Sequence, residues 1–446
     1  MPAARNRSRT GLSAPAASRP RLGLRGSAAV GAGVLAGRLT PLLRLGRGST
    51  VGGRVALTLD PQLLDRLAAG REVVIVSGTN GKSTTTRLVG EALSVDGPVA
   101  SNRTGANMTE GIVLALARER AAGRAVLEVD ESYVPSVAAR THPKVIALLN
   151  LSRDQLDRVA EVRKVADRWR QGMAQLSPDC TVVANADDPL VVWAAETAPH
   201  VVWVAAGRGW VQDAPLCPWC ASLLAVEDGA WRCTGCEHRR PDPELSDVDG
   251  RAVSTAGGSW PLRTALPGRA NRSNALVALG VALASGVDGD RASAAIAAVG
   301  SVDGRYERRR HGQHVARMLL SKNPAGWSEL FTMLEPAVPV VVAVNAEIAD
   351  GLDTSWLWDV QFELLAGRQV AVTGARRADV AVRLTVAGVP HTVAPDLAGA
   401  LAALPPGPVD VAANYTAMRD VRQALAGCPV VPEPVRVPSE PAGGAA

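Results

Sequence analysis

The sequence predicts an α/β protein with a first domain built on a parallel, doubly wound sheet and a second, Rossmann-like α/β domain towards the C-terminus. Short apolar runs alternate with longer stretches of helical spacing along most of the chain. The first run leads into a glycine-rich loop and a helix, and the alternation starts again from residue 312. With 446 residues, 47% of them apolar, the chain is long enough for two or three domains with buried cores.

The first 50 residues are expected to form a basic, largely disordered leader with a short helix near 28–46. They contain nine arginines and no acidic residue, so residues 51–446 carry a net charge of −4, which is the total of +5 less these nine. Positive charge confined to a tail, together with an aromatic content of 3%, argues against a nucleic-acid-binding protein. Weak attraction of the leader to an anionic membrane surface stays open.

The elements of the first domain follow in order. Apolar spacing over 57–69 favours a helix that starts at Asp60-Pro61, and 72–77 has the pattern of a buried strand. A helix is expected from the glycine loop to about residue 93, and Ala-rich sequence over 271–299 is helical in composition. Further buried strands are expected at 125–129, 145–151 and 182–184.

The second domain is expected to begin near 300–305. Strands are predicted at 338–344, 369–373 and 409–413, and residues 431–446 form a Pro- and Gly-rich tail. The predicted organisation is therefore a leader (1–50), an ATP-binding domain (51–303), a C-terminal domain (304–430) and a flexible tail. No apolar stretch approaches the roughly 20 residues that cross a bilayer, so a transmembrane protein is not expected.

Four of the six cysteines form two Cys-x-x-Cys pairs separated by twelve residues: Cys217, Cys220, Cys233 and Cys236. Two such turns can surround one tetrahedral zinc ion with four thiolates. Because the protein fills all four positions, the zinc is expected to be structural. The pairs predict a zinc ribbon inserted at about 210–240, with disulfides or free thiols as the alternative, and reduced thiolates fit a cytoplasmic protein.

The loop after the first strand has the features of a phosphate-binding loop: Gly78, Thr79, Asn80, Gly81, Lys82 and Ser83. Backbone amides at the start of a helix bind phosphate, Lys82 would reach the β- and γ-phosphates, and Ser83 would bind Mg²⁺. The position five residues before Gly81 is Val76 instead of glycine, which departs from the usual spacing. A chance glycine turn is the alternative.

Two carboxylates, Glu128 and Asp130, lie at the carboxyl end of a predicted strand, where open α/β sheets bind their ligands. Side chains two residues apart share one face of a strand, so both could face the Mg²⁺ ion of a nucleotide. The alternative is that one caps the next helix. Asp154 and Asp157 follow the next strand, and either could be a helix cap.

These motifs, taken together, resemble the Mur ligases. The segments that carry the resemblance stand in the order of that family: Gly78-Thr-Asn-Gly-Lys-Ser83, Leu127-Glu-Val-Asp-Glu131, Asn150-Leu-Ser-Arg-Asp-Gln-Leu-Asp157, Asn185-Ala-Asp-Asp-Pro189, Gly268-Arg-Ala-Asn-Arg-Ser-Asn274 and Gly304-Arg305. The resemblance covers roughly residues 50–430. It implies an enzyme that phosphorylates a carboxylate with ATP and lets an amine attack the acyl phosphate.

Three departures narrow the subfamily. Gln155 stands where amino-acid-adding Mur ligases usually carry histidine, and Arg170 where they carry a carbamylated lysine. Leu320 replaces the acidic residue usually found two places before the lysine of the C-terminal domain. These differences put the second metal site and the usual amino-acid substrate in doubt.

The chain is most similar to the MurT branch of this family. It has the zinc insertion, Ser321-Lys-Asn-Pro-Ala-Gly326 and Asp350-Gly-Leu-Asp-Thr-Ser-Trp356, and it lacks the N-terminal domain that binds a uridine nucleotide. The resemblance implies amidation of the D-glutamate α-carboxylate of lipid II, a membrane-linked substrate, in peptidoglycan synthesis. Ammonia would come from glutamine through a separate GatD-like glutaminase subunit, at the inner face of the membrane.

The resemblance also implies roles for single residues. Asp353 would orient the catalytic histidine of the glutaminase partner, whereas the residues alone favour a helix N-cap before 354–365. Asn271 and Asn274 would lie near the nucleotide, with caps of the Ala-rich helix as the alternative. Arg305 would meet the terminal phosphate, with an ordinary surface charge at the domain junction as the alternative. Lys322 would add positive charge beside the acyl phosphate, with a structural salt bridge as the alternative. Rival functions are an amino-acid-adding Mur or folylpolyglutamate-type ligase and an inactive nucleotide-binding scaffold.

Overall fold

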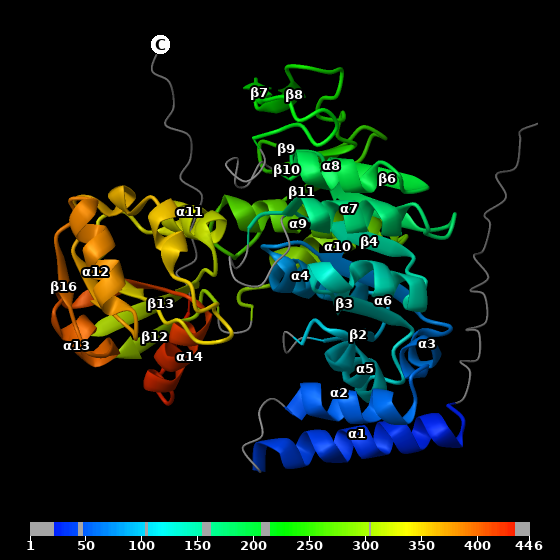
Figure 1. Cartoon of the computed structure of the whole chain (residues 1–446), viewed down its shortest axis with the longest axis horizontal. Coiled ribbons are helices and arrows are strands. Elements are labelled where there is room, and N and C mark those ends of the chain that lie inside the picture. The colour runs from blue at the N-terminus through cyan, green and yellow to red at the C-terminus, as the bar shows by residue number, and fades with distance from the viewer. Residues whose placement is uncertain are drawn as a thin grey trace, which may run out of the picture.

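The computed structural model describes residues 22–42, 48–102, 106–153, 162–206, 215–302 and 305–432. Within these ranges the chain forms two α/β units, each built on one large sheet, that lie side by side (Figure 1). The larger sheet has nine strands and the smaller has seven.

Three helices precede the first strand: α1 (Leu24–Leu42), α2 (Gly48–Leu59) and α3 (Leu63–Ala68). The helix expected near 28–46 has the same length in the structure, 19 residues, but starts and ends four residues earlier, and α2 crosses the expected start of the domain at 51. The single helix expected over 57–69 is two helices. The expected start signal Asp60-Pro61 separates them, because Pro61 disfavours a helical backbone at Asp60. The buried Asp60 carboxylate then accepts hydrogen bonds from the Gln62 amide and the Arg66 guanidinium at the start of the second helix.

The larger sheet has the strand order β11-β10-β9-β6-β5-β4-β1-β3-β2. Its strands are β1 (Glu72–Ser77), β2 (Val99–Ser101), β3 (Arg124–Glu128), β4 (Val145–Leu148), β5 (Thr181–Asn185), β6 (His200–Ala205), β9 (Leu245–Val248), β10 (Arg251–Ser254) and β11 (Ser259–Pro261). In this order the seven strands from β9 to β2 run parallel, whereas β10 pairs antiparallel with both β9 and β11. The sheet is therefore mixed, where a parallel sheet was expected, because short turns connect its last three strands.

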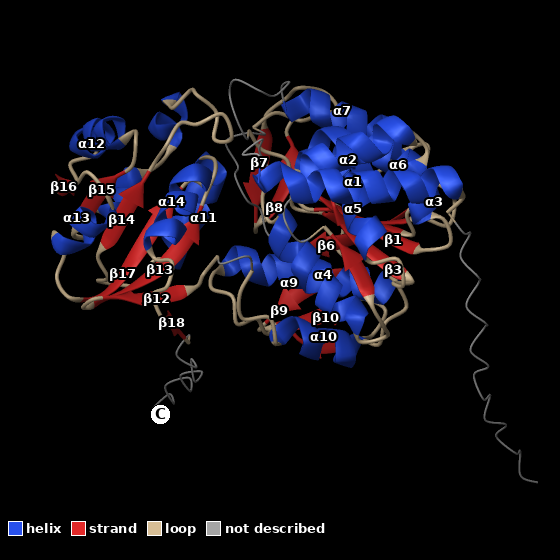
Figure 2. Cartoon of the chain, turned by 90° about the horizontal axis from the view of Figure 1, so that it is seen from below, coloured by secondary structure: helices blue, strands red, loops and turns tan. Residues whose placement is uncertain are grey.

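Helices cover both faces of this sheet (Figure 2). Along β1, Val73 and Ile75 belong to one apolar core, and Val74 and Val76 to the other, as expected for a doubly wound sheet. The elements around these cores are α4 (Lys82–Ser94), α5 (Thr109–Arg118), η1 (Glu131–Tyr133), α6 (Val134–Thr141), α7 (Val162–Met173), α8 (Pro189–Ala195), α9 (Arg269–Ala284) and α10 (Gly289–Ala297). The Ala-rich stretch 271–299 thus forms two helices, because Asp288 caps the second one.

The smaller sheet has the order β16-β15-β14-β17-β13-β12-β18. Its elements are β12 (Arg308–His311), β13 (His314–Leu320), α11 (Pro324–Met333), β14 (Val340–Ala343), η3 (Ser355–Asp359), η4 (Phe362–Leu365), β15 (Val370–Thr373), α12 (Arg377–Val386), β16 (His391–Val393), α13 (Leu397–Ala402), β17 (Gly407–Ala413), α14 (Tyr415–Ala424) and β18 (Val430–Val431). Five strands are parallel, and β12 and β18 are antiparallel. The helix expected over 354–365 is instead two short 3₁₀ helices.

A small hairpin of β7 (Leu224–Glu227) and β8 (Ala230–Cys233) is inserted between β6 and β9 of the larger sheet. It projects from the end of the larger unit opposite α1 (Figure 1). Among the described residues, no helix is both long and apolar enough to cross a membrane.

Candidate functional site

A cleft lies between the two units, at the carboxyl ends of β1, β3, β4 and β5. The glycine loop and the first turn of α4 form one wall, and residues from α9 form part of the same side. The C-terminal unit supplies the opposite wall, and its residues there include Arg305, Tyr306, Leu320, Ser321, Lys322, Ala325, Gly326, Glu329 and Met333. In open α/β sheets, ligands bind beside the carboxyl ends of the strands, at the point where the strand order reverses and the connecting helices change from one face of the sheet to the other.

The glycine loop turns sharply between β1 and α4. Gly81 has a φ of +87°, a left-handed conformation that glycine adopts without strain. A side chain at this position would also lie 2.6 Å from the Oδ1 atom of Asn274, so the loop has no room for one. The first amides of α4 have no acceptor within the helix, and they lie where its positive dipole end meets the cleft. The loop can therefore bind an anion.

Two residues after β4 hold this loop in place. The Asn150 side chain accepts a hydrogen bond from the Asn80 amide (2.9 Å) and donates one to the Asn80 carbonyl (3.0 Å). Ser152 and Thr79 are joined in the same way, because the Thr79 hydroxyl donates to the Ser152 carbonyl and accepts from its amide. These residues were not predicted as part of the site. Their positions at the carboxyl end of a neighbouring parallel strand were the signal that could have found them.

Lys82 lies almost buried beneath the loop, at 6% exposure. Its Nζ atom donates to the carbonyls of Gly78 (2.6 Å) and Thr79 (3.1 Å) and pairs with Glu131 at 3.0 Å. The backbone of Glu131 is fixed in turn, because its carbonyl accepts a hydrogen bond from the Trp169 indole. A phosphate that engages Lys82 would compete with Glu131, a partner that the sequence analysis did not identify.

Glu128 is one of the carboxylates that line the cleft, together with Asp188 and Glu329. It is 5% exposed and lines the cleft with Lys82 and Ser83, and among the described residues its carboxylate has no hydrogen-bond or ionic partner. Its backbone is held by Asn102, whose side chain bonds both its amide and its carbonyl. Asp130 does not line the cleft and accepts a hydrogen bond from the Ser132 amide as the cap of η1. The expected pair of facing carboxylates is therefore a single one.

Two cations from the C-terminal unit face the glycine loop across the cleft. Arg305 and Lys322 both line it, and neither side chain has a carboxylate partner within the described part of the chain. The salt bridge that was the alternative for Lys322 is absent there. Positive charge without a protein counter-ion, close to backbone amides, favours an anionic ligand.

Asn271 and Asn274 line the cleft from the first turns of α9. The Asn271 side chain donates to the Pro267 carbonyl (2.6 Å), and Asn274 contacts Gly81 through its amide. Asn271 does not cap the helix, because the N-cap residue of α9 is Gly268 and no described side chain accepts a cap hydrogen bond there. Asn274 contacts the glycine loop directly.

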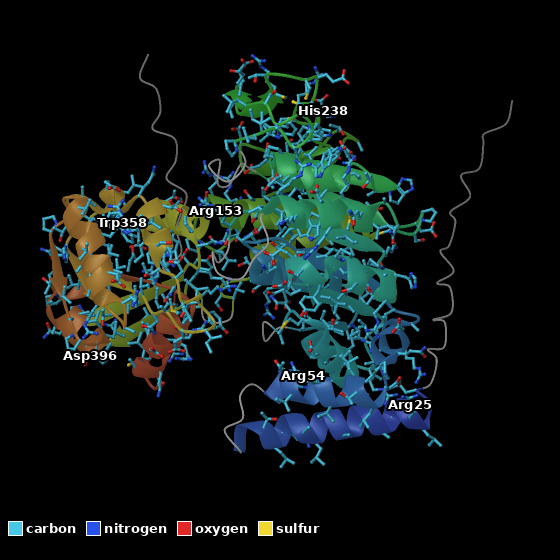
Figure 3. All side chains as sticks on the ribbon, in the orientation of Figure 1. Arg25, Arg54, Arg153, His238, Trp358 and Asp396 are labelled. Atoms are coloured by element: carbon cyan, nitrogen blue, oxygen red, sulfur yellow. The ribbon has the colours of Figure 1, made fainter. Side chains whose placement is uncertain are left out.

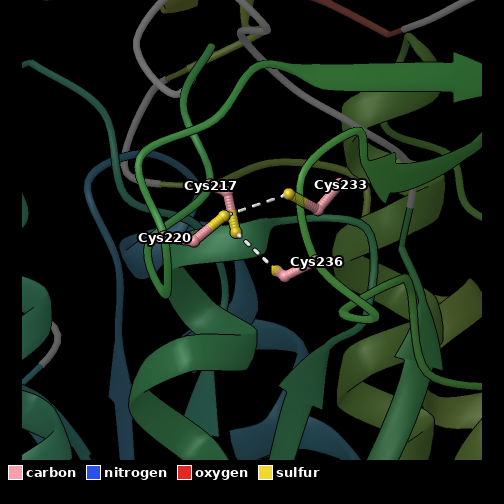
Figure 4. Close-up of side chains that lie close together, drawn as sticks. All are labelled: Cys217, Cys220, Cys233 and Cys236. Carbon is pink, nitrogen blue, oxygen red and sulfur yellow. Dashed lines mark hydrogen bonds between the residues drawn. The ribbon is translucent and has the colours of Figure 1, made fainter.

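The inserted hairpin holds four cysteine sulfurs that point toward one another (Figure 4). All four lie within 4.8 Å of one another, with 3.7 Å between Cys217 and Cys236 and 3.4 Å between Cys220 and Cys233. None forms a disulfide. A tetrahedral zinc ion with Zn–S bonds of about 2.3 Å separates its sulfurs by about 3.8 Å, so the cluster has the dimensions of a metal site.

Hydrogen bonds lower the pKa of one of these thiols and attach the hairpin to the larger sheet. Bonds from the side chain and backbone of Ser222 lower the pKa of Cys220 to about 6, which favours the thiolate that binds metal. Trp231 is buried at 2% exposure, and its indole donates to the Ala186 carbonyl beside β5 (3.0 Å). The Trp219 ring stacks on His238 at a centroid distance of 4.1 Å. His238 marks the outer end of the insertion in Figure 3.

Asp353 lies outside the cleft, fully exposed, just before η3. Its Oδ1 atom accepts a hydrogen bond from the Ser355 amide at 2.8 Å, and this bond holds the pKa of Asp353 below its ordinary value. The surrounding segment exposes more than half of four large apolar side chains: Ile348, Leu352, Trp358 and Leu364. A charged residue within an exposed apolar segment is typical of a protein-binding surface.

Comparison with known proteins decides the family. The Mur ligase middle domain matches residues 76–210, and the MurT ligase C-terminal domain matches residues 320–418. The lipid II isoglutaminyl synthase (glutamine-hydrolyzing) subunit MurT of Streptococcus pneumoniae R6 is 33% identical over 441 residues, covering 90% of this chain and 97% of that protein. The chain belongs to the MurT family.

Solved structures support the fold of this MurT-family chain. A pseudomurein peptide ligase type C from Methanothermus fervidus superposes with a TM-score of 0.62 at 18% identity, over 80% of this chain and 78% of that one. The folylpolyglutamate synthase of Mycobacterium tuberculosis, solved with ADP and AMPPCP, superposes with a TM-score of 0.58 at 16% identity, over 84% and 95%. The two-unit α/β architecture is therefore that of the Mur ligases.

The departures of this MurT-family member from amino-acid-adding ligases can now be placed. The Arg170 guanidinium lies over the Trp193 ring, 3.9 Å from its centroid, and does not line the cleft. Leu320 lines the cleft where the other ligases carry an acid. Gln155, Asp154 and Asp157 lie outside the described residues, as do 1–21 and 433–446.

Proposed function

We propose that this chain is the ATP-dependent synthetase subunit that converts the D-glutamate α-carboxylate of lipid II into a carboxamide. The observation that carries the proposal is the cleft in which the glycine loop and Glu128 face Arg305 and Lys322, two cations without a carboxylate partner among the described residues. The match along nearly the full length of a MurT subunit gives that cleft its substrate class.

The chemistry requires a good leaving group on a carboxylate. The substrate carboxylate attacks the γ-phosphorus of ATP and ADP leaves, and ammonia then attacks the acyl carbon and releases phosphate. Negative charge develops on the phosphoryl group in the first step and on the leaving phosphate in the second. The positive charges of Lys82, Arg305 and Lys322 would offset this negative charge. Their effect would be strong because a cleft between two units excludes the water that would screen the interaction.

Mg²⁺ fits the phosphate end of this cleft. The Glu128 carboxylate is buried and has no partner within the part of the chain that the structure describes, and a divalent cation is the group that such an oxygen prefers. Ser83, in the first turn of α4, lines the same end and would supply a hydroxyl ligand. When bound, the ion would neutralise part of the charge of the phosphate groups.

A structural Zn²⁺ ion fits the four-cysteine cluster. Two cysteine pairs with the sulfur separations of a tetrahedral site leave no position for water or substrate. The ion would fix the hairpin beside β5, at the outer end of the larger unit. Reduced thiols are consistent with a cytoplasmic protein.

Ammonia would come from a GatD-like glutaminase subunit. Cys428 is 3.6 Å from the His311 ring in the C-terminal unit, but this pair lies outside the cleft. Asp353 is exposed, ionised and flanked by apolar side chains, as a residue that orients a partner's histidine would be. Its Oδ1 atom is used by Ser355, so the other oxygen would make the contact with the partner.

The test is mass spectrometry of lipid II after incubation with this chain, ATP and Mg²⁺. The three arms contain ammonium, glutamine, or glutamine with the co-purified partner. We expect a product in which one carboxylate has become a carboxamide, with glutamine effective only in the third arm. A product heavier by a whole amino acid would instead show an ordinary Mur-type ligase. Absence of product despite tight ATP binding would show an inactive scaffold.

A further inference from the structure

The outer face of α1 is apolar although no other described element covers it. Leu24 is 94% exposed, Leu35 60% and Leu39 44%. At 100° per residue these three leucines lie within a stripe of about 60° on the helix. Ala28 and Gly31 continue the same stripe, so no polar group interrupts it. Figure 1 shows α1 at the edge of the molecule, with α2 on its inner side.

The charge of this region has one sign. The stripe is bordered by Arg25 and Arg38, both exposed, and Arg25 lies at one end of the helix in Figure 3. The first acidic residue of the sequence is Asp60, which is 1% exposed and paired with Arg66. An apolar stripe flanked by arginines, without acidic side chains, complements an anionic lipid surface.

A chain of close contacts connects this helix pair to the cleft. The backbone of α2 approaches that of α5 so closely that a side chain at Gly53 would lie 2.1 Å from the Glu110 carbonyl. Directly before α5, the Ala106 carbonyl accepts a hydrogen bond from Asn102 (2.9 Å), and Asn102 holds the backbone of Glu128. Helix α1 packs equally closely on α2, because a side chain at Gly52 would lie 2.3 Å from the Gly33 carbonyl, so its position is fixed relative to the cleft.

We propose that the outer face of α1 docks on an anionic bilayer, with the helix parallel to the surface and its leucines in the lipid interface. A membrane fits better than a protein partner because the stripe is a convex single-helix face and its charge is positive throughout. Docking would hold the cleft beside the membrane. The docking is argued from the face itself, whereas its use in reaching a membrane-linked substrate rests on the proposed function.

The experiment is flotation of the full chain with vesicles, which contain neither lipid II nor ATP, so that its result is independent of amidation. One set of vesicles holds equal amounts of phosphatidylglycerol and phosphatidylcholine, and the other holds phosphatidylcholine alone. We expect binding to the anionic vesicles that weakens in high salt. The double variant Leu35→Glu/Leu39→Glu should bind them more than tenfold less well.

Two further variants control for charge and for the leader. Val382→Glu/Val386→Glu places the same two charges, four residues apart, on exposed positions of α12 (56% and 64%) and should bind as the unchanged chain does. Deletion of residues 1–21 should leave measurable binding that still depends on Leu35 and Leu39.

Three results would overturn the proposal. The first is no flotation of the unchanged chain. The second is equal flotation of the Leu35→Glu/Leu39→Glu variant, with all binding lost on deletion of 1–21. The third is a change from dimer to monomer in that variant without any lipid binding, which would assign the face to a second copy of the chain.

Discussion

Lys322 and Arg305 offer a direct test of the cleft at the scale of single residues. Both cations face the glycine loop and have no carboxylate partner among the described residues, so replacing either removes charge without leaving an acid unpaired. We expect Lys322→Met and Arg305→Met each to lower the rate of ATP-dependent amidation about 100-fold with little change in thermal stability. The measurement is product formation with ammonium as the nitrogen source.

The matched control for Lys322→Met is Lys164→Met. Lys164 is an exposed lysine on α7, and it does not line the cleft. Its replacement should leave the rate within about twofold of the unchanged chain, because an exposed charge outside the cleft is screened by solvent. Equal loss in both variants would mean that net charge, and not position, explains the effect.

Substitution of Asp353 should affect the reactions with glutamine and with ammonium differently. We expect Asp353→Asn to abolish the glutamine-dependent reaction of the complex and to leave the ammonium-dependent reaction unchanged, because the amide keeps the shape and loses the charge. The Ser355 hydrogen bond lowers the pKa of Asp353 from its ordinary value of 3.8. The carboxylate therefore stays ionised from neutral pH down past pH 5, and acidification within that window should not reproduce the effect of the variant. Equal loss with both nitrogen sources would contradict the role in the partner's site.

At the scale of elements, the parts of the fold that local rules govern were predictable. The strand 72–77, the glycine loop and α4 follow from a buried apolar run, a turn that needs glycine and a helical stretch, and the structure has them within one residue. Glu128 could be predicted as a cleft carboxylate because the end of a parallel strand fixes where it lies. The cysteine spacing likewise predicted the cluster.

The missing predictions involve contacts between distant segments. Asn150 and Ser152 hold the glycine loop from 70 residues away or more, and Glu131 pairs with Lys82 across 49 positions.

The breaks at Asp60 and Asp288 depend on local side-chain caps that compete with continuous helical spacing. The periodicity of apolar residues in the sequence encodes neither these caps nor the contacts between distant segments.

The inserted hairpin should depend on its metal. We expect one equivalent of Zn²⁺ per chain, and we expect Cys233→Ser to lose it, because three remaining thiolates leave one position of a structural site open. The buried Trp231 would then become exposed, which tryptophan fluorescence detects as a shift to longer wavelength. Cys428→Ser is the control, since Cys428 lies outside the cluster and its replacement should keep the full metal content. Full zinc content in Cys233→Ser would rule out a four-thiolate site.

At the scale of the whole molecule, exposed ion pairs join the two units within the described ranges. Arg269 at the start of α9 pairs with Glu329 of α11 (3.4 Å), and Arg153 after β4 pairs with Asp359 of η3 (3.5 Å). Exposed ion pairs of this kind contribute little energy each, typically about 0.2–1 kcal/mol. Small differences in free energy can therefore open or close the cleft, as a ligase that admits and then encloses its substrates requires.

The contact between Gly268 and Met333 lies between the two units and can be tested by enlarging the side chain at position 268. Gly268 has a φ of +89°, and a side chain there would lie 2.6 Å from the Met333 side chain of the opposite unit. With a ψ of 160° the backbone of Gly268 lies in a region that is essentially restricted to glycine, so we expect Gly268→Ala to cost about 1–3 kcal/mol in strain and, in addition, to push the two units apart. Small-angle scattering with a non-hydrolysable ATP analogue should give a larger radius of gyration, and amidation should slow.

Two control variants distinguish the effect of backbone strain from the effect of the contact with Met333. Gly257→Ala imposes the same kind of strain at a φ of +98° with no atom within 4 Å, so it should lower stability without changing the radius of gyration. Gly268→Ala/Met333→Ala keeps the strain and removes the obstacle, so it should restore the compact form and much of the rate. If Gly268→Ala stays as compact as Gly257→Ala, the α9–α11 contact does not set the opening of the cleft. If it opens and the double variant closes again, the distance between these two helices controls closure.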